Sequence, residues 1–405
     1  MTDVMAGVRI VEVAEHTFVP AASAVLSDCG AEVIKIEHAE RGDAMRALGR
    51  TGVVDLSSGV HVLLEHSNRG KKSLGLDLQR PEGLEVFHAL LRTADVFLTN
   101  KLPHTLDKLQ LGVEALRAVN PRIIYVRGTA FGPKGPDAAR GGYDMTSFWC
   151  RGGSAASCTP AGLPGVIPQP GPAYGDSIGG MTIAGGIAGA LFKRERTGEP
   201  SVVDVSLLAT GAWAMGPAVA LSLQTGTPWA LPAGGGGPGN PLVGIYPTGD
   251  GRFLSFVMLQ GHVYWADLCR HLGREELIDD ERFATPAALA ENAEAARTEI
   301  RLALGTKTLA EWTAVFATLA GQWAPVQNTL ELARDPQVAA NGYLQTAKTA
   351  DGTSFELVAS PVQFDERPTT TARSPGFSEH GDELLAELGY EQDAILALKA
   401  AGAVT

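Results

Sequence analysis

The first 130 residues alternate between short apolar runs and helix-like segments, and this alternation constrains the fold more than any other feature. The apolar runs predict strands at Val8–Val13, Ala31–Glu37, Ser73–Leu78, Ala94–Leu98 and Arg122–Arg127. Helices are predicted between them at Pro20–Gly30, Pro81–Thr93 and Leu106–Val119. Strands and helices that alternate at this spacing form a parallel, doubly wound sheet. Because the apolar runs show no polar alternation, we expect strands buried on both faces and an α/β fold.

The pattern changes at Ile245. The segment around Gly249–Gly251 predicts a β-hairpin, and charged amphipathic helices are expected after it at Val263–Leu272, Ala287–Leu304 and Leu309–Ala320. These elements indicate a separate, smaller α+β domain over residues 245–325. A β-like segment, Tyr343–Val362, and a helix, Gly381–Ala401, complete the chain.

Charge is distributed unevenly. Charged residues make up 19% of the 405 positions, yet residues 152–192 carry a single charge, Asp176, and residues 205–249 carry none. The first window predicts a loop over Gly152–Gly175, followed by a buried glycine-rich helix over Ser177–Phe192. That helix has a normal stop signal, because glycine and proline follow a cationic last turn.

The second window contains the longest apolar stretch, Leu207–Leu223. Glycine and proline interrupt it and no basic flank follows, so we expect a buried helix and no membrane span. The run Gly234–Gly237 allows close approach to a ligand and backbone movement. It predicts either a mobile lid over a site or a linker into the small domain.

Asp176 is the sharpest candidate for a catalytic residue. A buried carboxylate without a partner is costly and has a raised pKa, and such groups cluster at functional sites. A purely structural role as helix N-cap stays open, because aspartate is a preferred N-cap residue. GDSIG at 175–179 also matches the GxSxG string, with Ser177 as nucleophile. A serine-hydrolase elbow needs a strand before it, whereas a Gly/Pro loop is predicted here.

Composition excludes several classes of function. The net charge of −12 argues against a duplex nucleic-acid binder. The nine histidines form no HxxxH or HExxH pair and the four cysteines have no metal-type spacing, so we expect no metal site. The N-terminus shows no signal-peptide pattern and the cysteines are typical of reduced thiols. We therefore expect a cytoplasmic protein that contacts no membrane.

Polar and cationic residues follow the predicted strands. Open α/β sheets bind ligands at the carboxyl ends of their strands. The residues in these positions are Glu15, His16, Thr17, Phe18, His38, Arg41, Arg46, Asn100, Lys101, Lys108, Arg140 and Tyr143, with a further basic cluster at 67–77. They indicate either a phosphate site or an ordinary solvated surface with scattered cations.

The sequence resembles the class III coenzyme A transferases, a group that also includes the α-methylacyl-CoA racemases. The resemblance covers nearly the whole chain. The segments that carry it are GVRIVEV (7–13), GAEVIKIE (30–37), GDAMR (42–46), SNRGKKSLGLDLQRPEG (67–83), ADVFLTNKLPHTLDKLQLG (94–112), NPRIIYVRGTAFGPKGP (120–136), GGYDM (141–145) and GDSIGGMTIAGGIAGALFKRERTGEPSVVDVSLL (175–208).

The resemblance implies an interlocked homodimer. Each subunit would have a Rossmann-like large domain from residues 1–205 and 330–405, a linker with a glycine loop over 206–244, and the small domain over 245–325. The two uncharged windows would then be buried between the chains.

The resemblance also implies an activity, the transfer of coenzyme A from an acyl-CoA donor to an acceptor carboxylic acid. Asp176 matches the nucleophile, which forms an aspartyl-CoA thioester, and Gly234, Gly235, Gly236 and Gly237 match a loop that closes over the site. Coenzyme A takes part as acyl-CoA substrate, with no metal. The positions matching coenzyme A contacts are Thr17, Phe18, His38, Leu76, Asp77, Leu78, Gln79, Asn100, Lys101, Leu102, Lys108, Gly141, Gly142, Tyr143 and Asp144, with Arg46 and Lys72 as further cations for the phosphates.

Three of these positions depart from formyl-CoA transferases. His38 stands where they have an arginine, Thr17 where they have a glutamine, and Gly141 where they have a lysine, although Arg140 is adjacent. The racemases pair a histidine with an aspartate as two bases. Tyr143 stands at the position of that histidine. Racemisation, non-catalytic acyl-CoA binding and CoA hydrolysis are the alternatives to transfer.

Overall fold

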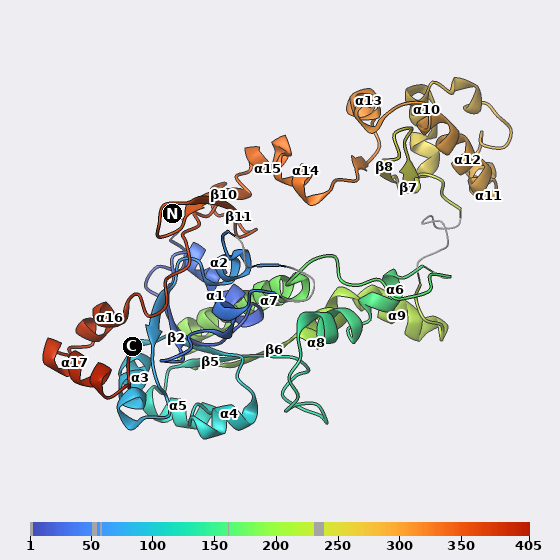
Figure 1. The fold of residues 1–405 in the computed structure, drawn as a ribbon. Coiled ribbons are helices and arrows are strands. Elements are labelled where there is room, and N and C mark those ends of the chain that lie inside the picture. The colour runs from blue at the N-terminus through green and yellow to red at the C-terminus, as the bar shows by residue number, and fades with distance from the viewer. Residues whose placement is uncertain (1–2, 51–54, 57–58, 161, 231–238) are drawn as a thin grey trace. The chain divides into compact units, whose positions relative to one another are not determined.

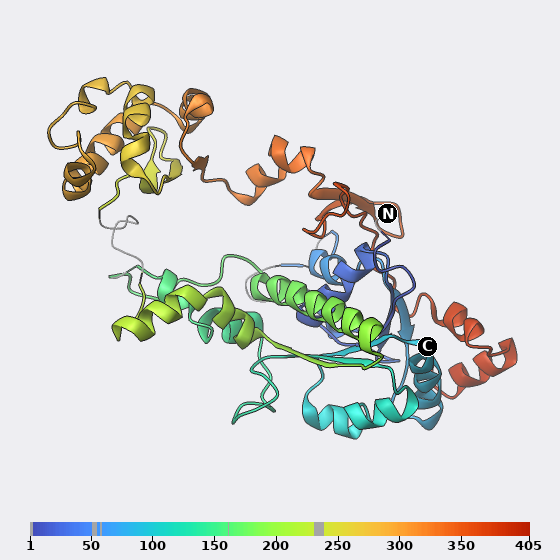
Figure 2. The same cartoon turned by 180° about the vertical axis from the view of Figure 1, so that it is seen from behind.

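The computed structural model describes residues 3–50, 55–56, 59–160, 162–230 and 239–405. The chain divides into two compact units, each described here by itself (Figures 1 and 2). Unit 1 comprises residues 1–156, 166–229 and 336–405, and unit 2 comprises residues 157–165 and 230–335. Unit 1 thus includes residues 206–229, which we expected in a linker.

The core of unit 1 is a six-stranded sheet in the order β3-β2-β1-β4-β5-β6. All five strand pairs are parallel. The strands are β1 (Arg9–Val13), β2 (Glu32–Glu37), β3 (Lys72–Gly75), β4 (Val96–Thr99), β5 (Ile124–Thr129) and β6 (Val202–Ser206). This is the order of a doubly wound, Rossmann-like sheet. The predicted parallel sheet is confirmed, and its strand order reverses between β1 and β4.

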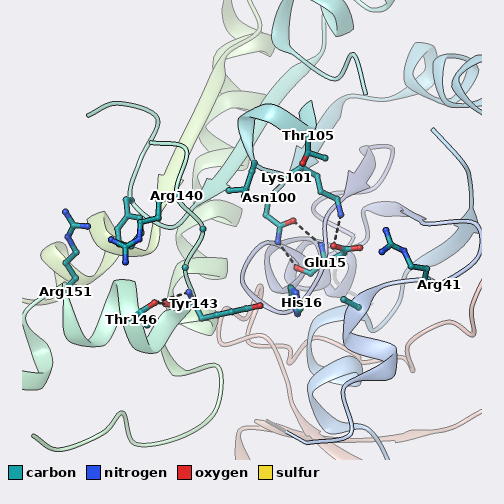
Figure 3. A pocket seen from close by; sticks show the side chains of 16 residues that line it. Glu15, His16, Arg41, Asn100, Lys101, Thr105, Arg140, Tyr143, Thr146 and Arg151 are labelled. Atoms are coloured by element: carbon teal, nitrogen blue, oxygen red, sulfur yellow. Dashed lines mark hydrogen bonds and ion pairs between the residues drawn. The ribbon is translucent and has the colours of Figure 1, made fainter. Parts of the chain in front are cut away.

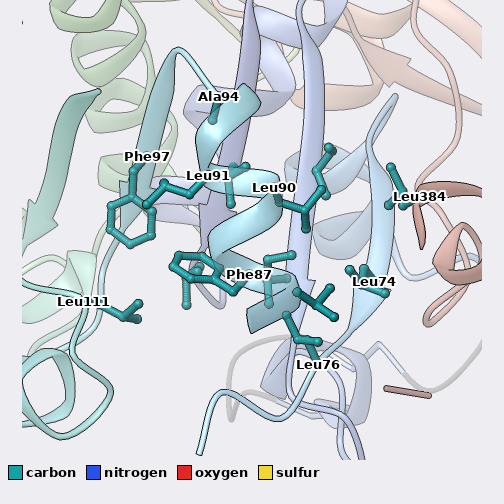
Figure 4. Close-up of a cluster of buried hydrophobic side chains, with 14 of the residues drawn as sticks. Leu74, Leu76, Phe87, Leu90, Leu91, Ala94, Phe97, Leu111 and Leu384 are labelled. Carbon is teal, nitrogen blue, oxygen red and sulfur yellow. The ribbon is translucent and has the colours of Figure 1, made fainter. Parts of the chain in front are cut away.

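Helices cover both faces of the sheet (Figure 1). Those near one face are α1 (Phe18–Asp28), α2 (Val62–Asn68) and α7 (Tyr174–Thr197); those near the other are α3 (Pro81–Thr93), α4 (Pro103–Lys108), α5 (Val113–Val119), α16 (Gly381–Glu387) and α17 (Gln392–Ala400). Side chains alternate along each strand. Val11 therefore joins the apolar core under α3, with Phe87 and Phe97 (Figure 4). Glu12 lies on the opposite face, where Ser23 of α1 donates a hydrogen bond to it.

Charged side chains lie buried on the α1 side of the sheet. Lys35 bonds Glu12 at 2.9 Å and Asp43 at 2.8 Å, and Lys71 bonds Glu12 at 2.9 Å. All four side chains are fully or almost fully buried. Burial favours the neutral form of Lys71 and lowers its pKa to about 7. Removing one member of such a network is costly because the others keep their buried charge.

The glycine-rich sequence of α7 is explained by its packing on α1. A Cβ atom on Gly179 would lie 2.3 Å from the ring of Phe18, and one on Gly180 would lie 2.8 Å from Ala21. Only glycine allows this approach. The helix ends at Gly198, which has a φ of 78° and donates its N–H to the carbonyl of Arg194. The predicted glycine-rich helix and its stop signal are confirmed.

The prediction of one buried helix over Leu207–Leu223 is wrong. The segment forms α8 (Leu207–Ala214) and α9 (Gly216–Thr225), which are bent by 68°, because Pro217 begins a new helix after Gly216. No residue of α9 is buried, and Leu223 is 81% exposed. Among the described residues, no single helix is long and apolar enough to cross a membrane; only this bent pair reaches the length and composition required.

Three other predicted helices are each interrupted. Leu106–Val119 divides between α4 and α5 at Gln110, whose φ is 55°, and Gly381–Ala401 divides between α16 and α17 at Gly389, whose φ is 89°. Ala287–Leu304 divides at Asn292 into α11 (Pro286–Glu291) and α12 (Ala293–Leu304). Apolar periodicity continues across these breaks because both halves face the same core.

Unit 2 contains the predicted hairpin. Strands β7 (Val243–Pro247), β8 (Phe253–Val257) and β9 (Trp323–Pro325) form an antiparallel sheet. Its buried side chains share one apolar core with α10 (Gly261–Leu272), α11, α12 and α13 (Leu309–Val315). The remaining elements along the chain are α6 (Ser154–Cys158), α14 (Thr329–Ala333), α15 (Pro336–Ala340), and the antiparallel pair β10 (Leu344–Lys348) and β11 (Ser354–Val358).

Candidate active site

Three cavities lie along the carboxyl ends of the strands in unit 1. Their volumes are about 810, 330 and 90 Å³, and they are called here the large, middle and small cavities. Lys101, which follows β4, lines all three; Figure 3 shows it with Glu15, which follows β1. Because the strand order reverses between β1 and β4, this edge of the sheet is where an open α/β fold binds ligands.

Most of the predicted site residues line these cavities. Those of the middle cavity are His38, Leu76, Asp77, Leu78, Gln79, Lys101 and Lys108. Those shared by the large and small cavities are Asn100, Lys101, Leu102, Gly141, Gly142 and Tyr143. The small cavity adds Phe18 and Asp176. Segments far apart in the sequence are therefore brought to one site.

Four predicted residues line none of the three cavities. Thr17 and Asp144 are buried. Arg46 bonds Glu37 at 2.7 Å, and Lys72 bonds Glu32 at 3.1 Å and Glu383 at 2.8 Å. Gly234, Gly235, Gly236 and Gly237 lie outside the described residues.

Asp176 lies in the first turn of α7 and faces the small cavity. Burial, together with the charge of Asp144, raises its pKa to about 8. No described residue donates a hydrogen bond to its carboxylate or pairs with it. The residue that precedes the helix is Ala173, and no side chain caps it. The alternative of Asp176 as N-cap is therefore wrong, and the carboxylate is available to a ligand.

Asp144 holds the start of α7 in place. Its carboxylate accepts hydrogen bonds from the Gly175 N–H at 3.3 Å and from Gln169 Nε2 at 3.0 Å. The residues after it, Met145–Cys150, form a π-helical turn, a rare geometry that is frequent at functional sites. Of these two carboxylates, Asp176 lines the small cavity and has no hydrogen-bond partner among the described residues, whereas Asp144 is buried behind it and is hydrogen-bonded.

Ser177 does not form a hydrolase elbow, because the segment before α7 is a loop. Its hydroxyl donates to the carbonyl of Ala173 at 2.8 Å. His66 Nε2 lies 3.1 Å from the same hydroxyl, a contact that spacing in the sequence did not indicate. Burial and the nearby Arg69 lower the pKa of His66 to about 4, so its imidazole is neutral at pH 7.

The large cavity has a cationic wall. Arg41, Lys101, Arg140 and Arg151 line it, and Figure 3 shows Arg140 and Arg151 across the cavity from Arg41. The guanidinium carbons of Arg151 and Arg140 lie 4.7 and 5.6 Å from the ring centre of Phe131. Guanidinium and ammonium groups suit phosphate oxygens. Arg151 was not singled out from the sequence, since it lies eight residues beyond the matched segment's Tyr143.

His16 also faces this site. Its ring lies edge-on to Tyr143, with 5.6 Å between ring centres, and it lines both the large and the small cavity. In the sequence, Tyr143 stands at the position where the racemases have a histidine. The fold supplies one from the end of β1, because β1 and β5 end at the same edge of the sheet.

No group of three or more histidine, cysteine, aspartate or glutamate side chains that would hold a metal occurs among the described residues. The side chains that line the cavities include the carboxylate of Asp176, the imidazole of His16 and several cationic groups.

The site thus combines an unpaired carboxylate with cavities lined by cationic side chains, and comparison with known proteins gives the family of the chain. The chain matches the model of CoA-transferase family III over residues 5–381. It belongs to that family.

Its relatives have CoA-transferase names. It is 32% identical over 400 residues to cinnamoyl-CoA:phenyllactate CoA-transferase of Clostridium sporogenes, covering 98% of this chain and 96% of that one. It is 33% identical over 393 residues to succinate–glutarate CoA-transferase of Agrobacterium fabrum, covering 95% of each. Among solved structures, a CaiB/BaiF family protein from Brucella suis matches with a TM-score of 0.80 and 29% identity, over 96% of this chain and 100% of that one.

Proposed function

We propose that this protein transfers coenzyme A from an acyl-CoA donor to a carboxylic acid, with Asp176 as the nucleophile that carries coenzyme A as a thioester. The observation that carries the proposal is the unpaired carboxylate of Asp176 on the wall of the small cavity. The small cavity shares lining residues with the large cavity, which has a cationic wall. Family membership, and relatives that include transferases of aromatic and dicarboxylic acids, support the same activity.

The reaction balances without any further reactant. A carboxylate oxygen of Asp176 attacks the thioester carbonyl of the donor, forming a mixed anhydride and releasing CoA thiolate. The thiolate attacks the anhydride at the Asp176 carbonyl, giving an aspartyl-CoA thioester and the free donor acid, which leaves with one oxygen of Asp176. The acceptor carboxylate attacks this thioester, and the thiolate then takes the acceptor acyl group and restores Asp176.

The middle and large cavities suit the nucleotide part of coenzyme A. Arg41 forms no ion pair with any described residue, and Lys108 is exposed and likewise unpaired in the described part of the chain. These cations, with Lys101, would meet the phosphates at the strand ends, and Leu76–Gln79 line the same cavity. Arg46 and Lys72 would act indirectly, because each is engaged with carboxylates and lines none of the three cavities. Lys101 also pairs with a carboxylate, that of Glu15 at 2.7 Å, but it lines all three cavities.

The proposed reaction also requires that water be excluded from the site, because hydrolysis of the anhydride or the thioester would consume the donor without transfer. The small cavity has a volume of about 90 Å³, about that of three water molecules. A substrate that fills it displaces most of the water next to Asp176.

We further propose that the protein is an interlocked homodimer, as its resemblance to the class III transferases implies. The single chain leaves α9 with no buried residue, and Trp213 of α8 is 85% exposed. Large exposed apolar patches mark interaction sites, and this stretch carries no charge.

Replacement of Asp176 tests the proposed activity. In Asp176→Asn the side chain keeps its size but loses its nucleophilic carboxylate, so transfer of coenzyme A between acetyl-, succinyl- or cinnamoyl-CoA and a panel of acids should fall by about 1,000-fold or more. CoA binding, measured by calorimetry, should persist. Transfer at the wild-type rate in this variant would refute the assignment.

A further inference from the structure

We infer that His16 is a second catalytic residue, which donates a hydrogen bond to the carbonyl oxygen of the thioester as Asp176 attacks it. The inference rests on the proposed transfer reaction. It adds a second side chain to that reaction, which the resemblance to the class III transferases does not identify. It follows from the conformation of His16, from the way the fold enforces that conformation, and from the cavity that its ring faces.

The backbone of His16 is in the left-handed region, with a φ of 66°. Residues other than glycine adopt this conformation uncommonly, because their Cβ atom then lies too close to the following carbonyl oxygen. Such strain persists only where the surrounding structure enforces it, and it clusters at active sites.

Asp43 enforces the conformation. Its Oδ1 accepts a hydrogen bond from the His16 N–H at 3.1 Å and from the Met45 N–H at 2.9 Å. The same carboxylate pairs with Lys35 at 2.8 Å, and both side chains are completely buried. From the other side, the amide of Asn100 bonds the backbone of Glu15 twice, at 2.7 and 3.2 Å. The turn after β1 is therefore fixed by a buried ion pair and by the end of β4.

The consequence of this turn is the position of the imidazole. The ring meets Tyr143 edge-on (Figure 3). It also lines the small cavity together with Asp176. No described residue forms a hydrogen bond with either of its ring nitrogens. Because the small cavity has a volume of only about 90 Å³, an acyl group attacked by Asp176 there lies within reach of both side chains.

The chemistry needs such a group. When the carboxylate adds to the thioester, negative charge develops on the carbonyl oxygen, and a preorganised N–H donor stabilises it. The charge of Asp144, which contributes to the raised pKa of Asp176, has the opposite effect. An imidazole carries an N–H donor in both its neutral and its protonated form, so the ring of His16 can donate a hydrogen bond to this oxygen.

Two substitutions distinguish the effect of the imidazole from the effect of the left-handed backbone. His16→Gly removes the imidazole but accepts the left-handed conformation, and His16→Asn keeps an N–H donor in a residue that also tolerates that conformation. Each variant is mixed with acetyl-, succinyl- or benzoyl-CoA, quenched at short times and treated with hydroxylamine. The rate of labelling at Asp176 is then read by peptide mass, and CoA affinity by calorimetry.

His16→Gly should slow labelling of Asp176 by about 100- to 1,000-fold, with CoA affinity changed by less than about threefold, and His16→Asn should recover at least about tenfold of the loss. Equal labelling rates in the wild type and His16→Gly would overturn the inference. So would a loss confined to CoA affinity, or an Asn variant no faster than Gly. Absence of labelling in the wild-type protein with every donor would instead refute the proposed transfer reaction.

The same samples in deuterated solvent test the competing role of His16 as a base in α-proton exchange. Transfer predicts negligible deuterium at the α-carbon of the recovered acyl-CoA. Incorporation at the rate of turnover, lost in His16→Gly, would assign the residue to racemisation and overturn its role as a carbonyl donor.

Discussion

At the scale of single residues, the site depends on two neighbouring carboxylates in different environments. Asp144 is buried but accepts two hydrogen bonds at one oxygen, from Gln169 and from the N–H of Gly175. Asp176 receives none from the described residues, and its pKa is raised to about 8. A charge without partners is a more reactive nucleophile, because no hydrogen bond has to break before it attacks.

This difference predicts the pH dependence of acylation. The reactive form of Asp176 is the carboxylate, so in the free enzyme the rate of Asp176 labelling should rise with pH and reach half its maximum near pH 8. In Asp144→Asn the second cause of the raised pKa disappears, so the midpoint should move to lower pH and the rate at pH 7 should increase. Asp107→Asn, on the exposed side of α4, is the control. A midpoint that stays in place or moves upward in Asp144→Asn contradicts this account.

The sequence was sufficient to single out Asp176, because one charge in 41 positions is visible without a structure. It placed His16 after the first strand without showing that its ring lines a cavity with Asp176, and it did not indicate Arg151. Their proximity to Asp176 depends on which strands adjoin in the sheet and on a left-handed turn, neither of which leaves a periodic signal. Arg46 and Lys72 are the opposite case. The sequence indicated them as cations for the phosphates, but both form ion pairs within the fold.

At the scale of elements, close contact between α1 and α7 determines where Asp176 lies. The contact requires glycine on α7 where the ring of Phe18 passes. Both helices were predictable, because each has consistent apolar composition and stop signals. The breaks within three other helices were not, because a single left-handed residue such as Gln110 or Gly389 interrupts a helix without changing its apolar pattern.

A pair of alanine substitutions on α7 tests this packing. Gly179→Ala places a Cβ atom 2.3 Å from Phe18, so it should lower the free energy of unfolding by about 1–3 kcal/mol. Gly185→Ala, whose Cβ atom would meet nothing within 4 Å, should raise it by about 0.5–1 kcal/mol. Urea denaturation at one protein concentration measures both. Equal effects of the two substitutions would show that the α1–α7 contact does not limit stability.

At the scale of the whole molecule, the two uncharged windows differ in how far a single chain buries them. The back half of the first is the helix α7, which packs against α1. The second includes α8 and α9, which expose apolar side chains. We predicted burial from the apolar composition alone, which does not reveal whether the covering surface comes from the same chain or from a second one.

The exposed helix therefore predicts self-association. Sedimentation equilibrium of the wild type should give the mass of two 42.4 kDa chains. Leu223→Asp, which puts a charge on α9, should weaken the dimer, whereas Leu396→Asp, on an exposed position of α17, should leave it intact. A wild-type mass of a single chain at micromolar concentration contradicts the proposed homodimer.

The most direct test of the account is the identity of the modified residue during turnover. Wild-type protein is incubated with an acyl-CoA donor in the absence of acceptor, quenched, and digested for peptide mass spectrometry with and without hydroxylamine. The account predicts a CoA thioester on Asp176 that hydroxylamine converts to a hydroxamate, that disappears on addition of an acceptor acid, and that is absent from Asp176→Asn. Coenzyme A transfer at full rate with Asp176 unmodified, or with the label on Ser177 or another residue, would contradict it.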